Sequence, residues 1–383
     1  EAWKVKDLEG YTLTFAPHPL LMENTSVIEQ LNDREFVLST SAPGYFSGLP
    51  GRMLIDGSEK WVGFIGGGHN LSNLTICAGD PTAGDCDKRG KGIFAIDLSN
   101  GNVLWAVTHL SDANMEYAFP GSPALLDLDL DGFTETMYIG DMGGSVWRVR
   151  MCTATDDNSC NTANWAVSRL FQPTGALAGR PIYTMPAAAK DAEGKLWVYW
   201  GTGDRVDITT AGTVDNFFAV KESTTFTGTR TASDLQTIST EGQVYNDPAK
   251  AGWVIAMPGT GEKVLAEPTV FGGVVYFTSY VPPTGTDPCA QTGSSNLYGI
   301  TYNTGGGTFD SGGSKVRSMT LGMGMATSPV VSFNPYTNQP DLYVTLSGGG
   351  GTVGASLSSP VWMATDLAVD LALGFSGGSG KAG

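Results

Sequence analysis

Short, strand-like runs of mainly hydrophobic residues, separated by polar and glycine-rich turns, recur along this chain. Residues 91–97 and 102–107 flank an Asn-Gly pair, and residues 136–141 and 145–149 flank a Met-Gly-Gly turn. Two such runs around a tight turn predict a β-hairpin. Looser copies of the unit follow at 195–203 with 216–221, at 273–279 with 296–302, and at 341–347 and 359–364.

These units recur every few tens of residues, which is close to the ~40–50 residue period of propeller blades. The pattern predicts an all-β fold, an irregular β-propeller of roughly seven blades with long loop insertions. Two stacked sandwiches are the competing architecture. We expect one propeller domain over residues 1–365 and a Gly/Ser-rich tail over 366–383. Polar stretches at 222–250, 303–316 and 347–360 are expected to be surface loops.

Composition supports this interpretation and narrows the function. Glycine contributes 52 of 383 residues and charged residues only 16%, which favours many tight turns over long surface helices. The net charge is −16 and the pI is near 4.5. An acidic surface repels phosphate backbones and anionic lipid, so we expect no nucleic-acid partner. No run of 18 apolar residues is present, so no transmembrane helix is expected.

The cysteine spacing is typical of loop disulfides in an oxidising compartment. Cys77 with Cys86 and Cys152 with Cys160 form two local pairs, and neither has the spacing of a zinc site. Cys289 is left over. Together with the start at Glu-Ala-Trp, which has no signal peptide, this indicates a mature or excised part of an exported, extracytoplasmic protein.

One segment carries a strong chemical signal. Carboxylates stand at Asp127, Asp129, Asp131 and Glu135, and Gly132 occupies the sixth position counted from Asp127. This spacing matches the first part of an EF-hand calcium loop, in which alternate side chains turn toward one centre and the glycine permits a sharp bend. We therefore expect a Ca²⁺ site at these carboxylates.

The same loop departs from a helical EF-hand. Tyr138 stands at the twelfth position, so Glu135 has to complete the coordination, and the carbonyl of Phe133 would supply the position-7 oxygen. Both flanks have strand character, which predicts a shortened calcium loop on a β-hairpin. The alternatives are an acidic hairpin without metal and a magnesium site, which would demand tighter octahedral geometry.

Several segments together resemble the C-terminal propeller of the PilY family of type IV pilus biogenesis factors. The most specific is 121–148, where the acidic loop runs into a Tyr-x-Gly-Asp hairpin that ends in Trp-Arg. Residues 263–278 and 286–298 resemble a second family signature. Residues 91–97 and 199–203 are weaker matches in the expected order, and the resemblance covers roughly residues 50–302 of the chain.

The resemblance implies an exported protein at the pilus tip or outer surface, passing through the periplasm. It implies partnership with minor pilins of the tip complex and roles in pilus priming, extension and retraction control, and surface adhesion. It also implies a von Willebrand-type N-terminal domain elsewhere in the same protein. By position, the calcium ligands would be Asp127, Asp129, Asp131, the carbonyl of Phe133, and Glu135, where the family more often has Asp.

The sequence predicts a protein that is not an enzyme. Residues 374–378 match the Gly-x-Ser-x-Gly nucleophile pattern, but they lie in the low-complexity tail without a strand-to-helix elbow. The alternative function is a quinoprotein dehydrogenase that uses pyrroloquinoline quinone, since residues 95–105 are similar to the tryptophan repeat of those propellers. That repeat occurs convincingly only once.

Overall fold

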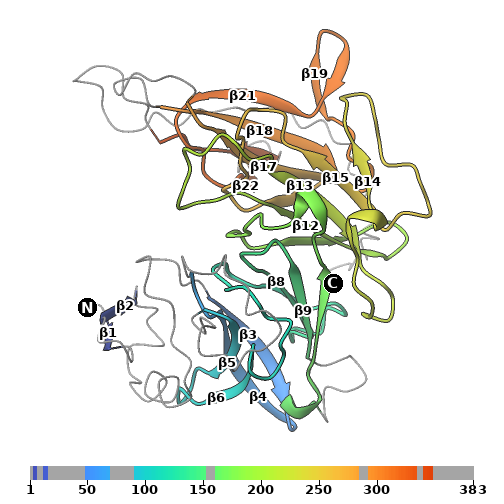
Figure 1. Cartoon of the computed structure of the whole chain (residues 1–383). Helices are drawn as coiled ribbons and strands as arrows, with labels where there is room; N and C mark the ends of the chain where they lie inside the picture. The colour runs from blue at the N-terminus through green and yellow to red at the C-terminus, as the bar shows by residue number, and fades with distance from the viewer. Residues whose placement is uncertain are drawn as a thin grey trace, which may run out of the picture.

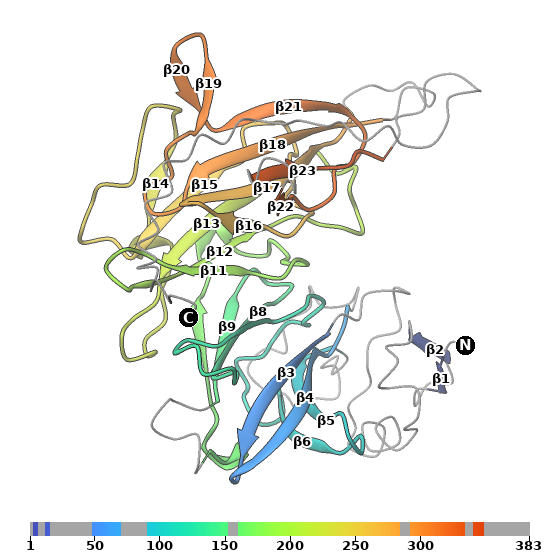
Figure 2. The ribbon, with the colours of Figure 1, turned by 180° about the vertical axis from the view of Figure 1, so that it is seen from behind.

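In the computed structural model the chain forms a series of β-sheets that follow one another in chain order (Figures 1 and 2). The structure describes residues 3–6, 12–15, 48–69, 90–151, 160–283, 292–333 and 340–347. Over these residues there is no α-helix. The composition of strands and short turns confirms the all-β expectation. The first sheets lie in the lower part of Figure 1 and the later ones in its upper part.

The first two sheets each have four antiparallel strands. The first sheet has the order β3-β4-β5-β6 and the second the order β10-β9-β8-β7, so chain neighbours pair throughout. Their strands are β3 (Gly48–Ile55), β4 (Ser58–Gly66), β5 (Gly92–Asp97), β6 (Val103–Thr108), β7 (Ala124–Leu126), β8 (Thr136–Gly140), β9 (Val146–Arg150) and β10 (Ala166–Phe171).

The third and fourth sheets repeat the plan with local additions. The third has the order β11-β12-β13-β15-β14 and the fourth the order β16-β17-β18-β21. Their strands are β11 (Ala187–Lys190), β12 (Leu196–Gly201), β13 (Asn216–Lys221), β14 (Gln236–Ile238), β15 (Gly252–Ala256), β16 (Thr269–Phe271), β17 (Val274–Val281), β18 (Ser294–Thr301) and β21 (Ser318–Met323).

Short elements complete the described chain. Three two-stranded pairs are β1 (Trp3–Lys6) with β2 (Thr12–Phe15), β19 (Phe309–Ser311) with β20 (Ser314–Val316), and β22 (Val330–Phe333) with β23 (Pro340–Tyr343). Three single 3-10 turns are η3 (Thr162–Asn164), η4 (Gly175–Leu177) and η5 (Ala232–Asp234).

At three junctions between successive sheets, the first strands contact one another. β3 lies against β7, β11 against β16, and β16 against β22. Consecutive up-and-down sheets that meet through their first strands are the arrangement of propeller blades. The described residues contain four sheets of at least four strands and the two strands β22 and β23 of a further unit. The number of seven blades stays a prediction.

Two expected loops contain strands. β14 lies within the predicted loop 222–250, and the hairpin β19–β20 lies within the predicted loop 303–316. Each of these strands has three residues, too few to show alternation, and β14 is specified by parallel pairing with β15 rather than by its own sequence. The third predicted loop, 347–360, and the predicted strand 359–364 lie outside the described residues, apart from Ser347.

Strands in the middle of the chain are buried on both faces. Phe217 and Phe218 of β13 point to opposite sides, because successive side chains alternate along a strand. Phe217 stacks on Phe277 of the fourth sheet at 3.8 Å between ring centroids, and Phe218 stacks on Trp200 at 5.0 Å. Trp200 lies beside Phe218 in the same sheet, and both belong to a core cluster that includes Tyr138 and Val146 of the second sheet. Neighbouring sheets thus cover both faces of the third sheet, which explains why β13 reads as a nearly continuous hydrophobic run.

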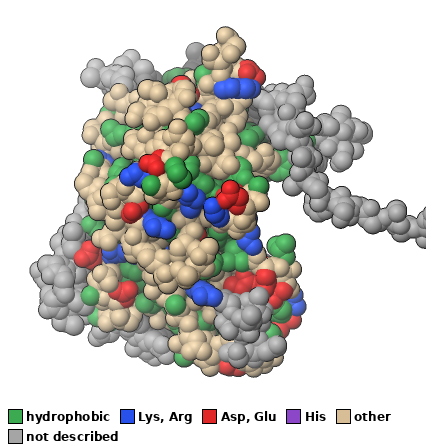
Figure 3. All heavy atoms as spheres, turned by 90° about the vertical axis from the view of Figure 1, so that its right-hand side faces the viewer, with side chains coloured by type: hydrophobic (Ala, Val, Ile, Leu, Met, Phe, Trp, Pro, Cys, Tyr) green, Lys and Arg blue, Asp and Glu red, His purple; other side chains and the backbone are tan. Residues whose placement is uncertain are grey.

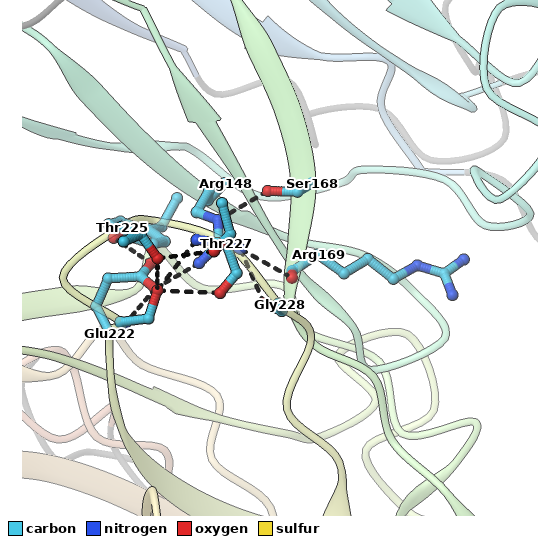
Figure 4. Close-up of polar contacts among 9 residues, drawn as sticks. Arg148, Ser168, Arg169, Glu222, Thr225, Thr227 and Gly228 are labelled. Atoms are coloured by element: carbon cyan, nitrogen blue, oxygen red, sulfur yellow. Dashed lines mark hydrogen bonds and ion pairs between the residues drawn. The ribbon is translucent and has the colours of Figure 1, made fainter.

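A buried ion pair ties the second sheet to the third. Figure 4 shows Arg148 of β9 and Glu222, which follows β13, pointing toward each other. Both side chains are almost fully buried, at 1% and 2% exposed. Tyr138 donates to the second oxygen of Glu222 (2.8 Å), while Arg148 also donates to Ser168 (2.8 Å) and to the carbonyl of Gly228 (2.9 Å). These bonds satisfy both charges where water has no access.

Removing one partner of this pair should be costly. Glu222→Ala leaves the Arg148 guanidinium buried without its counter-charge, which typically destabilises by about 3–5 kcal/mol. We expect a loss of that size in denaturant unfolding. Glu193→Ala, which breaks an exposed pair with Lys195, is the matched control and should cost less than about 1 kcal/mol. Equal losses in the two variants would show that the buried pair is not a tie between sheets.

Two hairpin turns use the same Asp-x-x-Gly-x-x-Trp lock. Oδ1 of Asp141 accepts from the amides two and four residues ahead (2.9 and 2.8 Å), and Oδ2 accepts from the indole of Trp147 (2.8 Å). Asp191 makes the same three contacts with its own turn and Trp197, at 2.9, 2.8 and 2.9 Å. Burial raises the pKa of Asp141 to about 6 despite these bonds. Asp191 is partly exposed; burial acts upward there too, but the same bonds hold its pKa below the ordinary value.

The two locks should therefore respond to pH with opposite sign. The raised pKa of Asp141 means that its contribution to stability is full below the ordinary carboxyl pKa and is lost as the pH rises through about 6. The contribution of Asp191 is present at neutral pH and is lost as the pH falls below that ordinary value. Between pH 4 and pH 7, the destabilisation caused by Asp141→Asn relative to the parent should therefore decrease. The destabilisation caused by Asp191→Asn should increase over the same range. Urea unfolding across that range measures this, and parallel curves for the two variants would contradict it.

Candidate metal centre

The acidic segment predicted from the sequence forms the connection between β7 and β8. The hairpin pairs Leu126 with Thr136, and the amide of Glu135 closes the loop on the carbonyl of Leu126 (3.0 Å). One carboxylate oxygen from each of four residues lies within 4.8 Å of the others. These residues are Asp127, Asp129, Asp131 and Glu135. The structure therefore brings together all four carboxylates that the spacing predicted.

The backbone of the loop wraps around its own first aspartate. Asp127 accepts from the amide of Leu130 (2.6 Å) and from that of Gly132 (2.8 Å), and Asp131 accepts from the amide of Phe133 (2.8 Å). Gly132 has φ +94°, so the sharp bend expected at this glycine is present. Leu130 also has a positive φ, +67°, and is 86% exposed, a feature that its residue type did not predict.

Glu135 differs from the three aspartates because it is buried, with 3% of its surface exposed. Its Oε2 accepts from the amide of Leu128 (2.6 Å), whereas its Oε1 is buried and accepts no hydrogen bond from the described residues. Burial, together with the charges of Asp129 and Asp127, raises the pKa of Glu135 to about 7. A buried carboxylate oxygen without a donor, on a side chain that converges with three further carboxylates, is an arrangement that a cation would relieve.

The donor set fits calcium. All four side chains offer hard carboxylate oxygens, which are the ligands that Ca²⁺ prefers, and the cluster contains no sulfur or imidazole. Phe133 lies within the same bend, with its ring beneath the Arg52 guanidinium at 4.5 Å. The role of its carbonyl as a fifth ligand stays a prediction.

The negative charge is unevenly spread over the surface. On the face drawn in Figure 3, Asp and Glu side chains gather mainly in the lower half, at the height of the first two sheets, while Lys and Arg lie across the middle. The acidic loop belongs to the second sheet. A local excess of negative charge attracts divalent cations to this part of the molecule.

Other sequence predictions fall mostly outside the described residues. Cys77, Cys86, Cys152 and Cys289 lie there, so both disulfides stay predictions, although Cys160 is buried at 3% exposed. The Gly-x-Ser-x-Gly pattern of residues 374–378 also lies there. Across the described residues, no helix is long and apolar enough to cross a membrane.

Replacing the buried carboxylate should separate its effect on stability without metal from its contribution to stabilisation by calcium. In EDTA above pH 7, Glu135→Gln should be at least as stable as the parent, because the contribution of a carboxyl with a raised pKa is lost as the pH rises through about 7. In calcium at ten times Kd, the parent should gain about 1.4 kcal/mol. The variant should gain much less. Melting temperatures in the two buffers test this, and a variant that is less stable than the parent in both would contradict it.

Comparison with known proteins supplies the context for this site. No protein-family model matches the chain. The chain is 26% identical over 306 residues to the type IV pilus biogenesis factor PilY1 homolog of Xylella fastidiosa. The alignment covers 69% of this chain but only 19% of that relative, so the chain spans about a fifth of its length.

The fold has a solved counterpart. The crystal structure of the Pseudomonas aeruginosa PilY1 C-terminal domain matches with a TM-score of 0.51 at 15% identity, covering 93% of this chain and 92% of that one. A europium-containing methanol dehydrogenase reaches a TM-score of only 0.31 at 12% identity, covering 80% and 54%, which is too distant to carry an argument. Sequence and fold together confirm the expected resemblance: this chain is similar to the PilY-type C-terminal β-propeller domain.

Proposed function

We propose that this chain is the calcium-binding propeller of a type IV pilus assembly protein. Ca²⁺ would be held by Asp127, Asp129, Asp131 and Glu135, with the carbonyl of Phe133 as the fifth protein ligand. The convergence of the four carboxylates and the likeness to a pilus biogenesis factor support this proposal. The single observation that carries the metal is the buried Oε1 of Glu135, which has no donor.

Electrostatics favours an ion over a metal-free loop. Two carboxylates about 4 Å apart repel by up to about 4 kcal/mol at an effective dielectric of 20. Four that meet within 4.8 Å multiply that cost, which a divalent cation offsets. Extracellular calcium modules commonly bind at about 10⁻⁴–10⁻³ M, so we expect the site to fill at millimolar calcium.

The cellular role that we propose follows from the relative's description as a type IV pilus biogenesis factor. The propeller acts outside the cytoplasm, at the pilus tip or outer surface, where it engages minor pilins. There it takes part in priming the filament, in the control of extension and retraction, and in surface adhesion. Calcium in the β7–β8 loop would adjust these interactions.

We propose a function without catalysis for this chain. A quinoprotein dehydrogenase was the alternative raised by the segment 95–105. No contact or cluster among the described residues favours that activity, so we do not propose it. A dye-reduction assay after reconstitution with pyrroloquinoline quinone distinguishes the two functions, since any turnover would favour the enzyme.

Loss of a central carboxylate should remove both the metal and its effect. Asp131→Ala should abolish stoichiometric calcium in metal analysis, while circular dichroism shows the fold retained, because Asp131 is exposed. In pull-downs with the minor pilins from the same source, calcium should increase capture by the parent but not by the variant.

Asp112→Ala is the matched control for this experiment. Asp112 is a partly exposed aspartate that accepts from Asn114 in the turn after β6 and is not part of the acidic cluster. It should keep calcium and pilin capture at parental levels. Unchanged calcium content in Asp131→Ala would refute the metal site. Calcium binding without any effect on pilin capture would refute the proposed role while leaving the site intact.

A further inference from the structure

The first and third sheets both contact the acidic loop, although neither supplies any of its carboxylates. It belongs to the second sheet, between β7 and β8. β3, the first strand of the first sheet, contacts it on one side. β11, the first strand of the third sheet, contacts it on the other. The loop is therefore a point at which three successive sheets meet.

On the side of the third sheet the link is one lysine. Lys190, the last residue of β11, donates from Nζ to the carbonyl oxygen of Leu128. The amide of that same Leu128 donates to Oε2 of Glu135 (2.6 Å). The backbone of Leu128 thus connects Lys190 of the third sheet to the buried carboxylate of Glu135 in the second sheet. Any ion that fixes Glu135 also fixes the carbonyl that Lys190 holds.

On the side of the first sheet, the link consists of a backbone hydrogen bond and a cation–π contact. The amide of Thr134, which precedes Glu135, donates to the carbonyl of Arg52 in β3 (2.8 Å). The Arg52 guanidinium lies over the ring of Phe133 at 4.5 Å and is held in place by Glu59 through two hydrogen bonds of 2.7 and 2.8 Å. This second link does not depend on Lys190.

We infer that the acidic loop is a fastener between sheets, in which Lys190 is the positioning residue that transmits ion binding at Glu135 to the first strand of the third sheet. This inference rests on the proposed calcium site. It adds that calcium orders β3 and β11, neither of which carries a ligand, and that the two strands are reached by separate routes.

The physical basis is local opening. Hydrogen bonds at an exposed loop break and re-form, and their contribution to a neighbouring strand depends on how often the loop is ordered. An ion that holds the loop closed keeps the Lys190 bond and the Thr134 bond formed for more of the time. One hydrogen bond of ordinary strength changes a local opening equilibrium by roughly fivefold.

Hydrogen exchange detected by mass spectrometry tests the inference on the full chain, with calcium chloride against EDTA. In the parent, calcium should slow exchange in β7–β8, β3 and β11, by roughly fivefold in the two outer strands. In Lys190→Met, which keeps the apolar stem but removes the donor, calcium should still slow exchange in β3 and no longer in β11. Lys195→Met removes the same charge from the other side of the same turn, where Nζ pairs with the exposed Glu193, and should behave as the parent.

Calorimetric titration with calcium on the same samples separates the possible failures. If the parent binds calcium but slowing is confined to β7–β8, the fastener is refuted and the metal site stands. If Lys190→Met keeps the slowing in β11, the lysine is not the link and the inference is wrong. If the parent binds no calcium, the proposed function itself fails, and the fastener with it.

Discussion

A carboxylate that cannot be solvated governs this part of the molecule. Glu135 is buried just before β8, with one oxygen held by the amide of Leu128, the other without a donor, and its carboxylate close to those of three aspartates. Neutral packing in the same place would need no ion. The loop instead collects negative charge at a junction between sheets, and we propose that a cation balances that charge.

The same problem recurs elsewhere with a different solution. Where the second and third sheets meet, Glu222 is buried against Arg148, so the counter-charge is part of the chain. Glu262, which precedes the fourth sheet, is 1% exposed and is satisfied by neutral donors, among them Asn296 and Tyr298 of β18. Of these three buried glutamates, Glu135 alone has a carboxylate oxygen left without a donor. Permanent partners make a fixed contact between sheets, whereas the contact that we propose at Glu135 would depend on the calcium concentration.

The sequence predicted those features that are local. Hydrophobic runs around turns marked two neighbouring strands in each of the first four sheets. The Asp-x-Asp-x-Asp-Gly spacing placed four carboxylates together because nine consecutive residues determine their geometry. Features that join distant segments were not predicted. Arg148 and Glu222 are 74 residues apart, and Lys190 and Leu128 are 62 apart. Nothing in the spacing of an exposed lysine distinguishes a link to an acidic loop from an ordinary surface charge, and β14 depends on a parallel partner.

A crystal structure grown in millimolar calcium, with an anomalous difference map to identify the ion, would show directly whether the acidic loop holds calcium. We expect one calcium peak inside the β7–β8 loop, about 2.3–2.6 Å from oxygens of Asp127, Asp129, Asp131 and Glu135. An ordered loop without a peak, or carboxylates turned outward into solvent, would contradict it.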